Sequence, residues 1–148
     1  MANENSMASN EAEIRKVIDD WATAFRAKDV DRIMSFYTPD VVAFDIVPPL
    51  QYRGAQAYMQ DWAQMLAMCD GPIGLEMYEL TVTAGDEAGF CHCLNHFTGK
   101  QTNGKEIDLW LRATVCYRKI NGRWLAAHEH VSVPIDMESG KALLDLRP

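Results

Sequence analysis

Apolar residues recur at three- and four-residue spacing in three stretches of the first half of the chain. This spacing places them on one face of a helix, so it predicts three amphipathic helices. The inner positions of these helices are Ile14, Val17, Ile18, Trp21 and Phe25, then Val30, Ile33, Met34 and Tyr37, then Ala55, Tyr58, Met59, Trp62, Met65 and Leu66. Asn10 and Glu13 fit a capping box at the start of the first helix, and Pro39 ends the second.

Alternation of apolar and polar residues dominates the second half and predicts strands over 75–84, 88–98, 105–119 and 123–133. A shorter strand over 41–45 precedes the third helix. The pair Asn121-Gly122 between two alternating runs is a strong hairpin signal. We therefore expect an α+β domain, in which three N-terminal helices pack on a curved, mostly antiparallel sheet.

Length and charge limit the organisation and the partners. A chain of 148 residues forms one ordinary domain, which we expect over residues 10–148. Residues 1–9 are polar and lack the apolar core of a signal peptide, which predicts a disordered tail on a cytoplasmic protein. The net charge of −7 and the scattered basic residues argue against nucleic acid or an anionic membrane as the partner. No stretch approaches the ~20 apolar residues of a membrane span.

The cysteines and histidines give little sign of a metal or redox site. The four cysteines, at 69, 91, 93 and 116, are too irregular for a disulfide framework. Cys91 and Cys93 form a CxC pair, which lacks the spacing of a zinc or redox motif, and we expect small buried residues. Two HxH-like pairs on neighbouring strands could converge on zinc, but no carboxylate shares their face. We expect neither a metal nor a cofactor.

Several segments together resemble a known superfamily. These segments are Trp21–Asp29, Phe36–Asp40, Val42–Asp45, Arg53-Gly54, Tyr117–Trp124 and His128–Ser132. They are similar to ketosteroid isomerase and the SnoaL-like proteins of the nuclear transport factor 2-like superfamily, and also to the association domain of calcium/calmodulin-dependent kinase II. The resemblance covers about residues 10 to 135 and implies a cone-shaped, cystatin-like fold. It implies less about function, because this fold hosts enzymes, ligand binders and assembly modules.

The isomerase resemblance places a catalytic base at Asp45, at the end of the first strand. The alternative from the residues alone is that Asp45 caps a turn before Pro48. The oxyanion hole of that family does not carry over. Trp21 and Trp62 stand at its tyrosine positions, and its neutral aspartate falls at Ala113 or Thr114. Authentic steroid isomerisation is therefore not expected.

Strand alternation leaves open which face of the sheet is concave. The association-domain resemblance favours Asn95, Arg112 and Glu129 pointing inward, where Arg112 would bind a substrate carboxylate or pair with Glu129. The opposite choice places the four histidines (His92, His96, His128 and His130) on the inner face. If the histidines instead lie on the outer face, that face is apolar enough for us to expect a homodimer through it.

These inferences predict a SnoaL-like enzyme or binding protein for a small apolar, cyclic molecule. If it is an enzyme, Asp45 would abstract a proton beside a carbonyl group without a cofactor, in an isomerase, cyclase or dehydratase type of reaction. The alternative is a non-catalytic module that binds a ligand or dimerises. The residues expected to contact the ligand are Trp21, Tyr37, Phe44, Trp62, Asn95, Trp110, Arg112, Glu129 and His130.

Overall fold

The first helix is longer than the sequence pattern predicts. The computed structural model describes residues 3–148, and α1 (Glu4–Arg26) already begins at Glu4. Asn3 caps it, because its side-chain oxygen accepts a hydrogen bond from the N–H of Ser6 at 2.8 Å. The predicted disordered tail is therefore wrong for residues 4–9, while residues 1 and 2 lie outside the described chain. Asn10 lies within the helix, and its side chain donates to the carbonyl of Gly85 at 2.9 Å.

The second helix is shorter than predicted, since Tyr37 belongs to a strand, while the third is close to the prediction. α2 (Val30–Met34) is a single short turn capped by Asp29, and α3 (Ala55–Ala67) follows Gly54. Between them, β1 (Tyr37–Phe44) begins four residues before the predicted strand, so Pro39 lies inside a strand and not at a helix end. A two-residue strand, β2 (Tyr52–Arg53), was not predicted, because two residues carry no periodicity.

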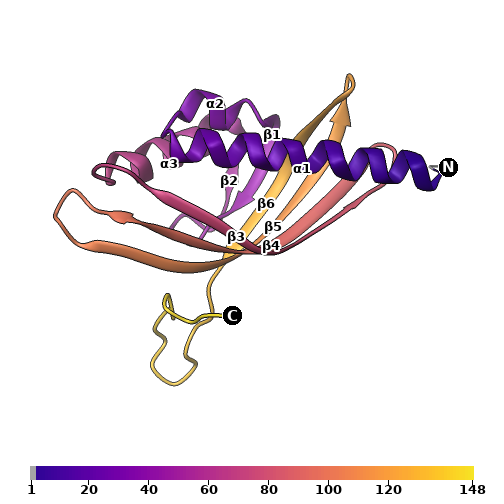
Figure 1. Cartoon of the computed structure of the whole chain (residues 1–148). Helices are drawn as coiled ribbons and strands as arrows, with labels where there is room; N and C mark the ends of the chain where they lie inside the picture. Colours follow the sequence, from indigo (N-terminus) through magenta and orange to yellow (C-terminus); the bar gives the residue numbers. More distant parts are fainter. Residues whose placement is uncertain (1–2) are drawn as a thin grey trace.

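The remaining strands form the predicted meander and dominate the sheet. They are β3 (Gly74–Ala84), β4 (Ala88–Lys100), β5 (Glu106–Ile120) and β6 (Arg123–Ser132). The strand order is β2-β1-β6-β5-β4-β3, and only the pairing of β1 with β6 is parallel. The three helices lie on one side of the curved sheet (Figure 1). This arrangement confirms the α+β cone-shaped fold.

A β-bulge between β5 and β6 changes the face of β6 along its length. The register shifts between Cys116 and Tyr117. Trp124 and Ala126 are buried before the shift, and Glu129 is buried after it. Uninterrupted alternation would place Glu129 on the face opposite Trp124. The extra residue of a bulge causes this switch of parity. The bulge therefore turns Glu129 toward the helices.

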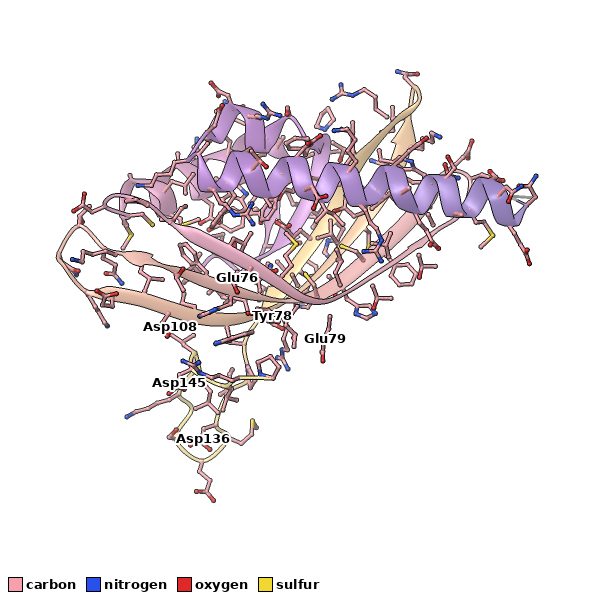
Figure 2. The ribbon with its side chains drawn as sticks, in the orientation of Figure 1. Glu76, Tyr78, Glu79, Asp108, Asp136 and Asp145 are labelled. Carbon is pink, nitrogen blue, oxygen red and sulfur yellow. The ribbon has the colours of Figure 1, made fainter. Side chains whose placement is uncertain are left out.

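Residues 133–148 lie on the side of the sheet opposite α1 (Figure 1). The segment is attached to β5, because the backbone N–H of Trp110 donates to the carbonyl of Leu144 at 3.0 Å. Figure 2 shows acidic side chains on this side, among them Glu76, Asp108 and Asp136. No helix within residues 3–148 has the length and apolar character needed to cross a membrane.

Candidate functional site

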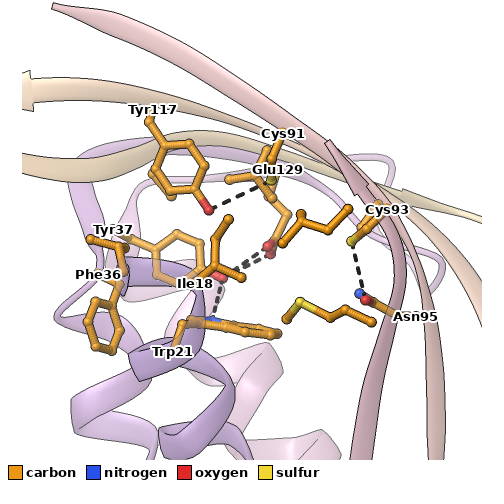
Figure 3. Close-up of a pocket in the computed structure, with 15 residues that line it drawn as sticks. Ile18, Trp21, Phe36, Tyr37, Cys91, Cys93, Asn95, Tyr117 and Glu129 are labelled. Atoms are coloured by element: carbon orange, nitrogen blue, oxygen red, sulfur yellow. Dashed lines mark hydrogen bonds between the residues drawn. The ribbon is translucent and has the colours of Figure 1, made fainter. Parts of the chain in front are cut away.

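A cavity lies between α1 and the inner face of the sheet (Figure 3). Its volume is about 40 Å³. That is room for about three water molecules. Its walls are mostly apolar, and its lining residues are Val17, Ile18, Trp21, Phe36, Tyr37, Met77, Leu80, Cys91, Cys93, Asn95, Ala113, Val115, Tyr117, Ala126 and Glu129.

Glu129 is a buried carboxyl group at the wall of this cavity. The hydroxyl of Tyr37 donates to its two oxygens at 3.0 and 3.2 Å, and the hydroxyl of Tyr58 donates to the same group. Trp21 extends this series of hydrogen bonds, because its indole Nε1–H donates to the Tyr37 oxygen at 3.1 Å. The sequence separations are 92 and 71 residues for the two tyrosines, so only the fold brings these groups together.

Burial controls the protonation of this cluster. Burial raises the pKa of Glu129, and the hydrogen bonds from Tyr58 and Tyr37 oppose part of that rise. Burial and the negative charge of Glu129 hold the pKa values of both tyrosine hydroxyls well above their ordinary range. The tyrosines are therefore permanent donors, while the carboxyl group is the member of the cluster that can exchange a proton.

Asp45 directly follows β1 on the inner side of the sheet. It lies two residues beyond Ala43, which pairs with Glu129 and is fully buried. Its Oδ1 accepts from the N–H of Ile46 at 2.7 Å. Burial, followed by the neighbouring carboxyl of Asp61 on α3, raises the pKa of Asp45 to about 7. Asp45 is partly exposed and lies outside the lining of the enclosed cavity.

The structure brings four of the residues expected to contact a ligand into the cavity wall, namely Trp21, Tyr37, Asn95 and Glu129. Trp62 lies behind them. Its ring packs edge-on against Trp21, with centroids 5.7 Å apart, and its Nε1 is enclosed without a hydrogen-bond partner among residues 3–148. Trp62 therefore supports the wall without lining the cavity.

The other four expected contacts lie on the outer face, which corrects their predicted placement. Arg112 is exposed and donates from Nε to the hydroxyl of Ser132 at 3.1 Å, because alternation along β5 turns Ala113 inward and Arg112 outward. Trp110 stacks on His96 with centroids 4.4 Å apart. The remaining pair, Phe44 and His130, contact each other edge-on, with ring centroids 5.3 Å apart. Among residues 3–148, therefore, no arginine accompanies Glu129 in the cavity lining.

The strand alternation that turns Arg112 outward also determines where the four histidines lie. His92, His96, His128 and His130 alternate with buried residues and occupy the outer face. Within the described chain, no group of three or more His, Cys, Asp or Glu side chains is arranged to hold a metal ion. His128 instead contacts the carbonyl of Val42 through Nδ1 at 2.6 Å.

Sequence reasoning missed several polar groups of the site. Tyr58 was treated only as an apolar helix position, and Asp61 was not considered. Their spacing of three residues along one helix was the available signal, since it places them on neighbouring positions of one face. A buried glutamate also requires donors, so Glu129 on an inner face could have prompted a search for hydroxyl groups on the helices.

The fold and cavity are those of the nuclear transport factor 2-like class, a cone of sheet closed by helices. A family model described as the SnoaL-like domain matches residues 14–136, and the chain belongs to this family. Among curated protein sequences, none matches the chain.

Solved structures agree with this assignment. An NTF2-like protein of unknown function from Pseudomonas putida KT2440 is 40% identical, with a TM-score of 0.88 over 96% of this chain and 99% of that chain. A ketosteroid isomerase-like protein from Erwinia carotovora atroseptica SCRI1043 is 18% identical, with a TM-score of 0.71 over 82% and 94%. A proposed scytalone dehydratase from Novosphingobium aromaticivorans DSM 12444 is 9% identical, with a TM-score of 0.77 over 86% of each chain. The last two similarities concern the fold alone.

Proposed function

We propose that this protein is a cofactor-free enzyme of the isomerase or lyase type, in which Asp45 abstracts a proton beside a carbonyl group of a small apolar substrate. The observation that carries the proposal is the position of Asp45. Its carboxyl group lies on the inner side of the sheet, next to a second carboxyl group, at the end of the strand that pairs with Glu129. It is partly exposed, so a substrate can reach it.

The electrostatics of Asp45 suit this role. A general base works best when its pKa lies near the working pH, because it is then ionised and still holds a proton strongly enough to take one from carbon. Burial and Asp61 raise the pKa of Asp45 to about 7. An aspartate that merely capped a turn in water would keep a lower pKa. The names of two distant fold relatives, an isomerase-like protein and a proposed dehydratase, are consistent with such chemistry.

The test uses the full chain and a panel of cyclic β,γ-unsaturated ketones, whose conversion to conjugated ketones raises ultraviolet absorbance. Exchange of the α-hydrogens for deuterium, followed by NMR, detects proton abstraction without isomerisation. Asp45→Asn should lower either rate by about 10²–10⁴-fold. Asp40→Asn is the matched control, since Asp40 lies on the same strand in an exposed position.

A carboxyl titration by carbon NMR supplies an independent test. Asp45 should titrate near pH 7, and Asp61→Asn should lower its pKa toward the ordinary value, because the neighbouring carboxyl helps to raise it. An ordinary pKa for Asp45, together with unchanged rates in the Asp45→Asn variant, would rule out the general-base role.

The size of the cavity favours a second candidate, a non-catalytic module that binds a small ligand or dimerises. A volume of about 40 Å³ accommodates no ring-sized substrate unless side chains move.

Exposed apolar residues of the outer face, such as Phe44, Tyr78 and Phe90, support the proposed homodimer. Sedimentation of the protein at micromolar concentration tests the homodimer, which a single species with the mass of one chain would exclude. A cytoplasmic location is likewise our proposal, which cell fractionation tests.

A further inference from the structure

The loop that directly follows Asp45, residues 46–51, connects β1 to β2 and is held by few contacts. Residues 46–50 are exposed, and Leu50 is 94% exposed although it is apolar. Within residues 3–148, no backbone-to-backbone hydrogen bond involves this loop. Its attachment therefore depends on side chains. Tyr52 supplies one such contact, because its hydroxyl oxygen lies 2.9 Å from the carbonyl oxygen of Pro48.

The hydroxyl group of Tyr52 faces two oxygen atoms at once. Besides the carbonyl oxygen of Pro48, it lies 3.0 Å from Oδ1 of Asp61 on α3. A phenol has one hydrogen to donate, and a backbone carbonyl has none. Both contacts are therefore full hydrogen bonds at the same time only when Asp61 has a proton that it donates to the phenol oxygen. The geometry thus favours a proton held by carboxyl groups at this junction.

Asp45 is the second carboxyl group at this junction. Its side chain lies in hydrogen-bonding contact with Asp61, and its Oδ1 accepts from the N–H of the first loop residue at 2.7 Å. The charged groups that act on Asp45 are Asp61 on α3 and Glu129 on β6, and both are acidic. Burial raises the pKa values of the two tyrosines that face it, Tyr52 and Tyr58, so they stay neutral. None of these groups offsets two adjacent carboxylates, which favours a proton shared by the pair.

We propose that Asp45, Asp61 and Tyr52 form a proton-dependent clamp that holds the 46–51 loop against α3. When the carboxyl pair holds its proton, a continuous series of hydrogen bonds joins Asp45 to Asp61, Asp61 to Tyr52, and Tyr52 to the loop at Pro48. Loss of the proton leaves two carboxylates in contact, and their repulsion releases the loop from the helix. Ionisation of Asp45 and release of the loop beside it are therefore one event.

The clamp responds to pH in the neutral range. Burial, followed by the neighbouring Asp61, raises the pKa of Asp45 to about 7. The shared proton is present below this pH and is lost as the pH rises through it, so the loop is held in acid and released in weakly alkaline solution. This control of access to the carboxyl pair does not require that Asp45 is a catalytic base, so the clamp is independent of the proposed function.

Limited proteolysis of the full chain with proteinase K tests the clamp, because cleavage follows the population of the released loop. Mass spectrometry gives the ratio of cleavage within residues 46–51 to cleavage within residues 137–142, which are also exposed. This ratio cancels the pH dependence of the protease itself. In the wild-type protein it should rise about tenfold between pH 5.5 and pH 8.5, since the carboxyl pair loses its proton in that interval.

Asparagine has an uncharged donor at every pH, so Asp45→Asn and Asp61→Asn should each keep the ratio low at pH 8.5. Tyr52→Phe removes the hydroxyl link and should give a high ratio at both pH values. Asp40→Asn and Tyr78→Phe, at exposed positions, are the matched controls and should behave as wild type. The proposal is overturned if the wild-type ratio does not change with pH, or if it rises equally in both asparagine variants. The assay needs no substrate, so its failure is distinguishable from a failure of the general-base role.

Discussion

Tyrosine–glutamate hydrogen bonds occur in two opposite environments of this protein. Tyr58 donates to Glu129 between α3 and the inner face of the sheet, where both side chains are buried. On the outer face Tyr78 donates to Glu76 at 2.6 Å, and Tyr78 is 39% exposed. The chemical groups are identical, so any difference in their effects comes from burial. On the outer face water replaces a lost partner, whereas the inner pair has no such substitute.

The largest expected effect on stability comes from removing the buried hydrogen bond of this comparison. Tyr58→Phe removes one donor from a buried carboxyl group and should lower the free energy of unfolding by about 2–3 kcal/mol at pH 8. Tyr78→Phe, the same change on the outer face, should lower it by about 0.5 kcal/mol or less. Urea unfolding of both variants measures the difference. Equal losses would show that burial does not separate the two pairs.

The cysteines extend the comparison to reactivity. Burial raises the pKa of the Cys91 thiol to about 11 and that of the Cys93 thiol to about 12, while Cys116 lies on the outer face and is half-buried. Iodoacetamide at pH 8 should therefore modify Cys91 and Cys93 at least about 100-fold more slowly than an ordinary thiol. Cys116 should react first, as followed by mass spectrometry of peptides. Comparable rates at all three sites would contradict an enclosed inner face.

Asp45 should make the protein less stable as the pH rises. Its native pKa of about 7 lies above the ordinary value of 3.8, so the native state holds the proton more tightly than the unfolded chain. Its stabilising contribution is complete below about pH 4 and is lost as the pH rises through 7. The stability of Asp45→Asn relative to wild type should thus increase by about 1–2 kcal/mol between pH 4 and pH 8, after allowance for partial exposure.

Urea unfolding at the two pH values measures this change. Asp40→Asn is again the control, because the pKa of Asp40 is lowered and its substitution should produce no such increase. A pH-independent difference between Asp45→Asn and wild type would show that Asp45 has an ordinary pKa in the native protein.

The smallest effect belongs to the charged pair of the outer face. His96 Nε2 lies 2.6 Å from the carboxyl of Asp108, whose side chain is 51% exposed. Asp108→Asn should change the free energy of unfolding by about 0.5 kcal/mol or less, since solvent screens the pair. A loss similar to that of Tyr58→Phe would show that residues 133–148 or a partner subunit buries this face.

The sequence by itself determined the elements and the class of fold. Helical spacing located α3, and alternation with Asn121-Gly122 located β5 and β6, because these signals depend only on neighbouring residues. The segments similar to SnoaL-like proteins then indicated the cone. Local patterns failed where a cap or a tertiary contact decided the outcome, as at Asn3 and at Pro39 within β1.

Only the tertiary structure decided which side chains meet. Alternation could not say which face of the sheet is concave, so Arg112 was grouped with Glu129 although it lies on the outer face. The bulge of β6 opposite Cys116 and Tyr117 turns Glu129 inward, and it has no sequence signature here. Tyr58 reaches Glu129 across 71 residues because α3 packs beside the sheet. Burial is a property of this assembled arrangement, and burial is what raises the pKa values of Glu129 and Asp45.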